Sequence, residues 1–283
     1  MFAKKSLGQN FLKNHEVVKD IIAAAEIKEG ETVLEVGPGK GILTEALIEA
    51  GARVIAVEKD RRLIELLRKK FPTARIVEGD ILNFDISSLF ANCSPRFAGE
   101  AGKLNISSFK LVANIPYYIT GTILEKFLTA QNQPTRVVLM LQKEVAKRVV
   151  AAPNSKDYGI LSIAVQFYAV PEIAFNISRK SFYPEPKVDS SVLKIVPREK
   201  VAVDVRNEGL FWGLIKSAFY YRRKTLLNSL ALSGHSKEII KNVLEFAGID
   251  QNKRPEQVSM EEWGKIADTL MEFMLSQQKR MKF

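Results

Sequence analysis

The sequence predicts an α/β fold, a parallel sheet with helices on both faces, followed by a small all-helical domain. Through about the first 150 residues, short apolar runs alternate with amphipathic segments of helical period, which is typical of a parallel sheet. The run Gly37-Pro-Gly-Lys-Gly41 separates the first strand from the next helix. After about residue 200, the apolar residues follow helical spacing only. We therefore expect one domain over residues 1–200 and a second over 201–283.

Apolar periodicity, capping residues and glycine or proline stops define the elements of the first domain. Asp60 is the expected N-cap of a helix, and Gly51 ends the helix before it. The stretch 160–168 fits a helix and a strand equally well, and 91–108, rich in Ser, Asn, Gly and Pro, is expected to be a surface loop or insertion. In chain order, the expected elements are helix 15–26, strand 32–36, helix 42–50, strand 53–57, helix 61–70, strand 75–77, strand 111–113, helix 122–130, strand 136–141, helix 143–150 and strand 192–196.

The second domain is expected to contain helices alone. Gly248, Pro255 and the cap candidate Ser259 punctuate its apolar pattern. No alternating apolar segment of strand period remains after residue 200. The expected helices cover residues 210–221, 224–232, 237–247 and 260–278.

The charge of the chain indicates a polyanionic partner. Lys and Arg number 42 against 32 Asp and Glu, which gives a net charge of +10 over 283 residues. A basic chain of ordinary globular composition suits nucleic acid, although a solvated basic surface gives the same count.

Several classes of protein and site are disfavoured. The single Cys93 precludes an intramolecular disulfide and fits a reducing, cytoplasmic compartment. His15 and His235 are the only histidines, so zinc sites and histidine-based triads are poorly supplied, and we expect no metal. No apolar run reaches the roughly 18–20 residues that a membrane span needs. Residues 1–8 are basic but lack the apolar core of a secretory signal.

Glycines and carboxylates at successive strand ends predict an adenosine-binding crevice. Glycines after the first strand let a ligand approach the backbone closely. Glu58 ends the second strand, where a carboxylate can accept hydrogen bonds from both ribose hydroxyls, and Asp80 ends the third, where it can accept from the adenine amine. NAD and S-adenosylmethionine (SAM) both contain adenosine. The loop favours SAM, because Glu35 precedes it and it departs from Gly-x-Gly-x-x-Gly. The alternative is a turn that needs glycine for its geometry alone.

The tetrapeptide Asn114-Ile-Pro-Tyr117 follows the fourth strand and suits methylation of an adenine amine. That amine is a poor nucleophile, because its lone pair is delocalised into the ring. An Asn oxygen and a backbone carbonyl that accept its hydrogens favour a pyramidal nitrogen and stabilise the charge that develops on it. Pro116 stiffens the turn, and Tyr117 can stack on the base. The alternative is an ordinary turn with a core tyrosine.

With these motifs in order, the chain resembles the small-subunit rRNA adenine N6,N6-dimethyltransferase family over essentially its whole length. The departure from Asp-Pro-Pro-Tyr, with Ile115 at the second place, disfavours DNA and protein-glutamine methyltransferases. The matching segments are Lys4 to Leu12, Leu34 to Gly41, Val57 to Asp60, Gly79-Asp80, Ala113 to Tyr117, Phe182 to Ser190 and Tyr221 to Ser229.

The resemblance implies a Rossmann-like SAM-dependent methyltransferase sheet and a role for each matching residue. Asn10 and Leu12 close over SAM, Gly37 and Gly39 line its methionine part, Glu58 holds its ribose with Lys59 alongside, and Asp80 and Ile81 recognise its adenine. Asn114, with the carbonyl of Ile115 or Pro116, accepts from the target amine. Tyr117 stacks on the flipped adenine, and Phe182 covers its other face. A disordered tail around Asn10 and a buried anchor at Phe182 are the alternatives.

The resemblance also implies the substrate, two adjacent adenosines in the 3′-terminal hairpin loop of 16S rRNA, within the small ribosomal subunit or its precursor. A base must leave its stack to be methylated. We expect a monomer that contacts RNA through the start of its second domain, unless that basic cluster is a solvated face. The expected RNA contacts are Lys216, Tyr221, Arg222, Arg223 and Lys224.

Three other functions remain open. A 23S rRNA adenine methyltransferase of the macrolide-resistance type shares the motif order, although Pro186 to Ser190 and Arg222 to Thr225 favour the small-subunit enzyme. A non-catalytic ribosome assembly factor is disfavoured because Asn114 and Glu58 are both present. An NAD dehydrogenase is disfavoured because both histidines lie outside the motifs.

Overall fold

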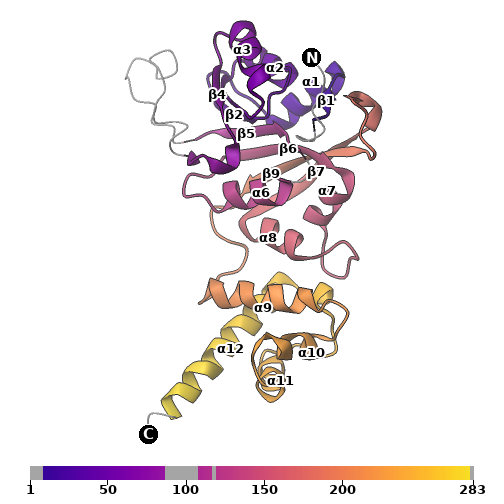
Figure 1. The fold of residues 1–283 in the computed structure, drawn as a ribbon. Coiled ribbons are helices and arrows are strands. Elements are labelled where there is room, and N and C mark those ends of the chain that lie inside the picture. The colour runs from indigo at the N-terminus through magenta and orange to yellow at the C-terminus, as the bar shows by residue number, and fades with distance from the viewer. Residues whose placement is uncertain (1–8, 87–107, 117–118, 281–283) are drawn as a thin grey trace. The chain divides into compact units, whose positions relative to one another are not determined.

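The computed structural model describes residues 9–86, 108–116 and 119–280, and these form two compact units (Figure 1). The first unit comprises Met1–Lys147 with Ala169–Pro197, and the second comprises Arg148–Tyr168 with Arg198–Phe283. This division differs from the expected single boundary at residue 200. The reason is packing, because Ile163 and Phe167 are buried in one apolar cluster with the C-terminal helices.

The first unit contains a seven-stranded sheet with the order β4-β3-β2-β5-β6-β9-β7. Its first five strands in that order are parallel to one another, while β9 is antiparallel to β6 and β7 is antiparallel to β9. The strands are β2 (Thr32–Val36), β3 (Arg53–Glu58), β4 (Arg75–Glu78), β5 (Lys110–Asn114), β6 (Arg136–Gln142), β7 (Ala169–Ile177) and β9 (Ser190–Pro197).

The register of the parallel strands brings their carboxyl ends to one edge. Val36 at the end of β2 pairs with Val57 on one side and with Ala113 on the other. Gly37, Glu58 and Asn114 each follow one of these three residues in the chain. The loop, the carboxylate and the amide that the sequence predicted to act together therefore emerge side by side.

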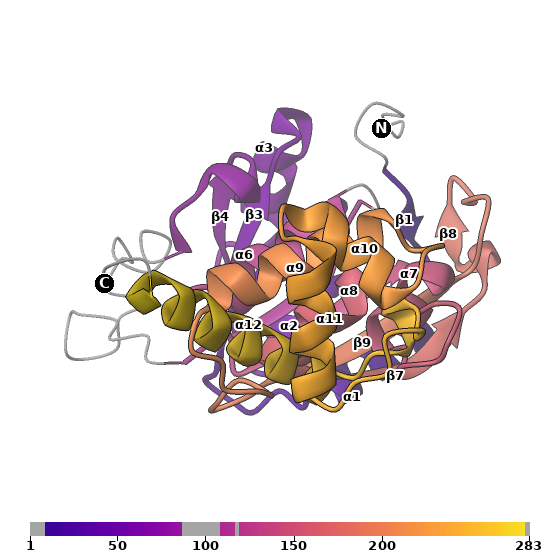
Figure 2. The same cartoon turned by 90° about the horizontal axis from the view of Figure 1, so that it is seen from below.

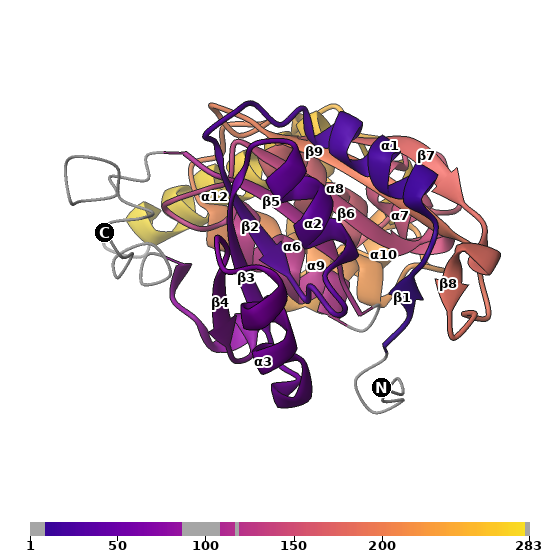
Figure 3. The ribbon, with the colours of Figure 1, turned by 90° about the horizontal axis from the view of Figure 1, so that it is seen from above.

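Helices cover both faces of this sheet, as expected. Helices α1 (His15–Ala25), α2 (Ile42–Glu49) and α3 (Arg61–Lys70) lie over one face (Figures 1 and 3). They share an apolar core with inward side chains of the strands such as Val54 and Val112. Helix α6 (Thr120–Leu128) lies on the opposite face (Figure 1) and α7 (Lys143–Val150) follows β6.

The expected strands and helices of the first unit are confirmed, but three strands were missed. The edge strand β7 contains Pro171, and its inward side chains between the two ends are only half-buried, so its apolar pattern is weak. Strands β1 (Phe11–Leu12) and β8 (Phe182–Tyr183) pair antiparallel in a two-residue ribbon, too short for a periodic signal. The late strand, β9, is present but antiparallel. The expected loop over 91–108 lies almost wholly outside the described residues.

The second unit is helical, as expected (Figure 2). The ambiguous segment forms α8 (Ile160–Tyr168), because two of its apolar side chains are needed in the core of this unit. Trp263 and Phe211 are fully buried at the centre of that core. The other helices are α9 (Glu208–Tyr220), α10 (Leu226–Leu230), α11 (Lys237–Phe246) and α12 (Met260–Arg280).

Short 3₁₀ helices complete the two units: η2 (Ile81–Asn83), η5 (Arg179–Ser181), η6 (Ala231–Ser233) and η7 (Pro255–Gln257). In the described part of the chain, no helix has the length and apolar character needed to cross a bilayer.

Candidate active site

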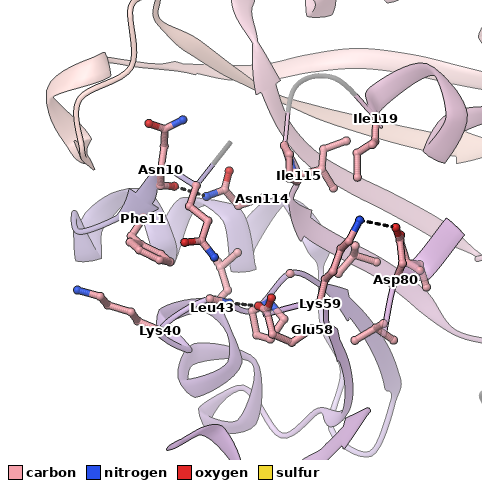
Figure 4. Close-up of a pocket in the computed structure, with 18 of the residues that line it drawn as sticks. Asn10, Phe11, Lys40, Leu43, Glu58, Lys59, Asp80, Asn114, Ile115 and Ile119 are labelled. Carbon is pink, nitrogen blue, oxygen red and sulfur yellow. Dashed lines mark hydrogen bonds and ion pairs between the residues drawn. The ribbon is translucent and has the colours of Figure 1, made fainter. Parts of the chain in front are cut away.

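A pocket opens at the carboxyl edge of β2, β3 and β5 (Figure 4). Its wall is formed by the glycine loop, the turns after β3 and β4, the end of β5 and the N-terminal segment, by which we mean residues 9–12. Of the predicted site residues, those that line it are Asn10, Leu12, Gly37, Gly39, Glu58, Lys59, Asp80, Ile81, Asn114, Ile115 and Pro116.

The glycine loop needs glycine for both conformation and space. Gly37, Gly39 and Gly41 all have a positive φ, of 68°, 59° and 84°, which side chains with a Cβ rarely adopt. A Cβ on Gly41 would lie 2.2 Å from a ring carbon of Phe71, and one on Gly39 would lie 3.1 Å from the ring of Phe11. The loop thus presents bare backbone to the pocket, which suits a closely held ligand.

Glu58 is a buried carboxylate tied to the backbone on both sides. Its Oε2 accepts a hydrogen bond from the Gly39 amide at 3.0 Å, and its Oε1 accepts one from the Asp60 amide at 2.8 Å. Burial raises the pKa of Glu58, while the backbone donors oppose that rise. A carboxylate has about four acceptor sites, so these two bonds leave capacity for hydroxyl donors in the pocket.

Asp80 keeps a negative charge at the far end of the pocket. Its Oδ1 caps η2 by accepting from the Leu82 amide at 3.1 Å, and its Oδ2 accepts from Lys59 Nζ at 2.8 Å. Burial alone would raise the pKa of Asp80, but these two donors hold it below its usual value. Lys59 therefore acts on the pocket through Asp80, a contact that the motif alone does not show.

The N-terminal segment forms one wall of the pocket. The Gln9 side-chain amide donates to Asp60 Oδ2 at 3.0 Å, and the Asn10 carbonyl accepts from Asn114 Nδ2 at 3.1 Å. Phe11 lies under Lys40 Nζ, 5.2 Å from its ring centre. This segment is ordered by contacts with three separate parts of the sheet edge.

Two predicted catalytic residues are not placed at the pocket. Tyr117 lies outside the described residues. Phe182 is 1% exposed and packs in the apolar core of the first unit with Leu12, away from the pocket lining. Its neighbour Tyr183 is 60% exposed, because successive side chains of a strand point to opposite sides.

Other lining residues were missed by the sequence analysis. Gln9 and Phe11 belong to the same opening motif as Asn10 and Leu12, so that motif was the available signal. Asp60 supports this wall without lining the pocket, and the sequence analysis gave it only as an N-cap and as the end of the segment Val57 to Asp60. It does cap α3, and it also binds Arg62 and Gln9. The other lining residues that the sequence analysis missed are Val36, Pro38, Lys40, Ile42, Leu43, Val57, Gly79, Leu82 and Ile119.

Among the described residues, no group of three or more His, Cys, Asp or Glu side chains is arranged so that it could bind a metal ion.

Glu35 lies on β2 behind the glycine loop and is 1% exposed. Its Oε2 accepts a hydrogen bond from Thr44 Oγ1 of α2 at 2.7 Å, which ties the two ends of the loop together. Burial, aided by the nearby charge of Glu58, raises the pKa of Glu35 to about 8. At neutral pH this carboxyl is therefore mainly protonated and supports the loop from below.

Glu35→Gln should remove a fall in stability with rising pH. The pKa of Glu35 is 4.5 in the unfolded chain and about 8 in the folded chain. Between these two values the folded chain holds a proton that the unfolded chain has lost, so the free energy of unfolding falls as the pH rises. We expect the free energy of unfolding of the variant, minus that of the wild type, to rise by at least about 1 kcal/mol between about pH 5 and pH 8.5. Urea denaturation measures it, with exposed Glu65→Gln as control. A constant difference across the window would contradict the assignment.

Comparison with known proteins places this site in a family. The model of the family described as ribosomal RNA adenine dimethylase matches residues 2–272. A relative from Moorella thermoacetica, named ribosomal RNA small subunit methyltransferase A, is 42% identical over 94% of this chain and 92% of its own length. One of the same name from Clostridioides difficile is 42% identical over 94% and 90%.

Solved structures agree with the family match. A dimethyladenosine transferase from Plasmodium falciparum is 27% identical, with a TM-score of 0.75 over 94% of this chain and 98% of its own. The 23S rRNA methyltransferase ErmE is 24% identical, with a TM-score of 0.67 over 93% and 100%, which shows a common fold. The family match over nearly the whole chain, with the pocket at its motifs, leads to one conclusion: this chain belongs to the ribosomal RNA adenine dimethylase family.

Proposed function

We propose that the chain is a SAM-dependent rRNA adenine N6,N6-dimethyltransferase. Its substrate would be the pair of adjacent adenosines in the 3′-terminal hairpin loop of 16S rRNA, in the small subunit or its precursor. The observation that carries the proposal is the position of Asn114, whose amide lines the same pocket as Glu58 and Asp80. The 42% identical relatives named as small-subunit methyltransferases support the choice of RNA.

The pocket fits SAM part by part. The buried Glu58 carboxylate has acceptor capacity for two ribose hydroxyls, and the charged Asp80 can accept from the adenine amine. The bare backbone of the glycine loop leaves room for the methionine part. When bound, SAM supplies an electrophilic methyl group on a sulfonium.

Asn114 Oδ1 is proposed to accept a hydrogen bond from the target N6 amine, and the carbonyl of Ile115 or Pro116 accepts the second. Both acceptors favour the pyramidal nitrogen that can attack. A nitrogen–carbon bond forms as the carbon–sulfur bond breaks, and the fixed acceptors stabilise the positive charge developing on nitrogen. The alkylated amine is acidic enough to lose its proton to water, so no strong base is needed. The monomethylated amine keeps one N–H for the second transfer.

Asn114→Ala should lower methyl transfer to small subunits by about a hundred-fold or more, because one prearranged acceptor is lost, while SAM binding persists. The measurement is transfer of labelled methyl from SAM to unmethylated small subunits, large subunits and naked rRNA in parallel, with nucleoside analysis. Dimethyladenosine in 16S rRNA is the expected product.

Two outcomes would overturn this function. Label in large-subunit rRNA alone would assign the chain to the 23S type of enzyme. Binding of SAM without transfer to any RNA would indicate an assembly factor. The expected monomer and cytoplasmic location stay predictions.

We further propose that the region around the end of α9, in the second unit, contacts RNA. Lys216, Arg223 and Lys224 are exposed around the end of α9, and Tyr220 beside Tyr221 is 80% exposed. Tyr221, the predicted contact, is half-buried, so Tyr220 is the ring here that suits stacking on bases, while the cations suit contact with phosphates. Arg222 differs from these, because it donates to the Lys156 carbonyl at 2.7 Å and pairs with Glu256. Its role is at least partly structural.

Replacing Arg223 and Lys224 together by Ala should weaken RNA binding and reduce the slope of log affinity against log salt by about 2, since each phosphate contact contributes about 0.9. Filter binding to a 16S rRNA hairpin over a range of salt measures both. The control replaces Lys237 and Lys241, two exposed lysines of α11, and should leave the slope near that of the wild type. An equal loss of RNA affinity and of salt slope in the two double variants would mean that binding depends on net charge alone, which would contradict a specific contact at the end of α9.

A further inference from the structure

We propose that the main-chain carbonyl of Asn10 is a positioning group for the proposed reaction. It fixes which end of the Asn114 side-chain amide is available to the target amine. The inference rests on the proposed function and deepens it, because it assigns a task to the backbone of the N-terminal segment that no side chain performs.

The hydrogen bond determines the orientation of the amide. Asn114 Nδ2 lies 3.1 Å from the Asn10 carbonyl oxygen. A carbonyl only accepts, so the amide nitrogen must face it, and the reversed amide would set two acceptor oxygens against each other. Figure 4 shows the nitrogen on the line to Asn10 and the Asn114 oxygen turned away from it. Oδ1 is thus presented as an acceptor, which is what an N6 amine requires.

The Asn10 carbonyl is itself held on both sides in the chain. On one side, Gln9 is anchored to Asp60, which is 3% exposed and accepts two hydrogen bonds from the Arg62 guanidinium. On the other, Leu12 is buried in the apolar core and pairs with Phe182 in the β1–β8 ribbon.

Two further contacts tighten this hold. Lys13 extends the ribbon by donating its amide to the Ser181 carbonyl at 2.9 Å. The ring of Phe11 lies close against the glycine loop. These contacts fix the Asn10 carbonyl before any substrate binds, so little entropy is lost in orienting Asn114 at the moment of reaction.

Weakening the hydrogen bond between Asn114 Nδ2 and the Asn10 carbonyl should affect the chemical step and not the affinity for SAM. An amide released from Asn10 can turn its NH2 group toward the target amine, which places donor against donor and is unproductive. The carboxylates proposed to bind SAM, Glu58 and Asp80, accept from Gly39 and Lys59, and neither of these two hydrogen bonds involves the Asn10 carbonyl. A purely structural tie between the N-terminal segment and β5 would instead alter stability or SAM binding.

The test replaces the peptide bond between Asn10 and Phe11 by an ester, with the α-hydroxy analogue of phenylalanine introduced at position 11 of the full chain. The ester makes the Asn10 carbonyl a weaker acceptor. We expect kcat for methyl transfer to small subunits to fall about five-fold, the size of one weakened hydrogen bond, with an unchanged Kd for SAM by calorimetry.

The matched control is an ester at Lys13, which removes one amide donor of the same ribbon and leaves the Asn10 carbonyl intact. Its kcat should stay near that of the unmodified chain. Equal losses of kcat in the two esters, or a loss of SAM affinity with unchanged kcat, would overturn the inference.

A double-substitution cycle with Asn114→Asp isolates the orientation effect. Both oxygens of a carboxylate are acceptors, so there is no amide to orient. One of them faces the Asn10 carbonyl and is repelled by it, so the ester at position 11, which weakens that carbonyl, should not lower kcat further in this background. The same five-fold cost with Asp as with Asn would refute a positioning role. Absence of methyl transfer by the unmodified chain would refute the proposed function itself, and this inference with it.

Discussion

The two hydrogen bonds of the buried Glu58 carboxylate connect the parts of the site. One oxygen holds the Gly39 amide of the glycine loop, and the other holds the Asp60 amide at the start of α3. Asp60 in turn binds Gln9, and the next residue, Asn10, binds Asn114 at the end of β5. A continuous set of contacts thus runs from the loop to the amide proposed to meet the target base, with Glu58 at its origin.

Charge is distributed in two opposite ways in this chain. The net charge of +10 suits a polyanionic RNA, while the pocket contains the carboxylates Glu58 and Asp80 and backs onto Glu35 and Asp60. A cationic sulfonium ligand is compatible with such a pocket. Burial raises the pKa of Glu35 and Glu58, whereas Arg62 holds the pKa of Asp60 well below its usual range. Asp60 is therefore the carboxylate most firmly fixed in its charged form.

Sequence predicted those parts of the fold and site that depend on local rules. Strand ends, the positive-φ glycines and the capping Asp60 follow from spacing and residue type, and all are present. The β1–β8 ribbon, the burial of Phe182 and the helical state of α8 depend on contacts between segments far apart in the chain. For the same reason, the pairing of Lys59 with Asp80 and of Gln9 with Asp60 had no signal in the motifs. The motifs located the pocket and placed Asn10 and Leu12 at it, but not the contacts that hold the N-terminal segment in place.

The most direct test of the account is whether Glu58 holds a ribose. Calorimetry should compare S-adenosylhomocysteine with its 2′-deoxy analogue on the wild-type chain and on Glu58→Gln. The account predicts that loss of the hydroxyl weakens binding to the wild type by about ten-fold, the size of one hydrogen bond to a charged acceptor, and much less in the variant. Equal affinity of the wild-type chain for the two compounds would contradict the assignment of this crevice.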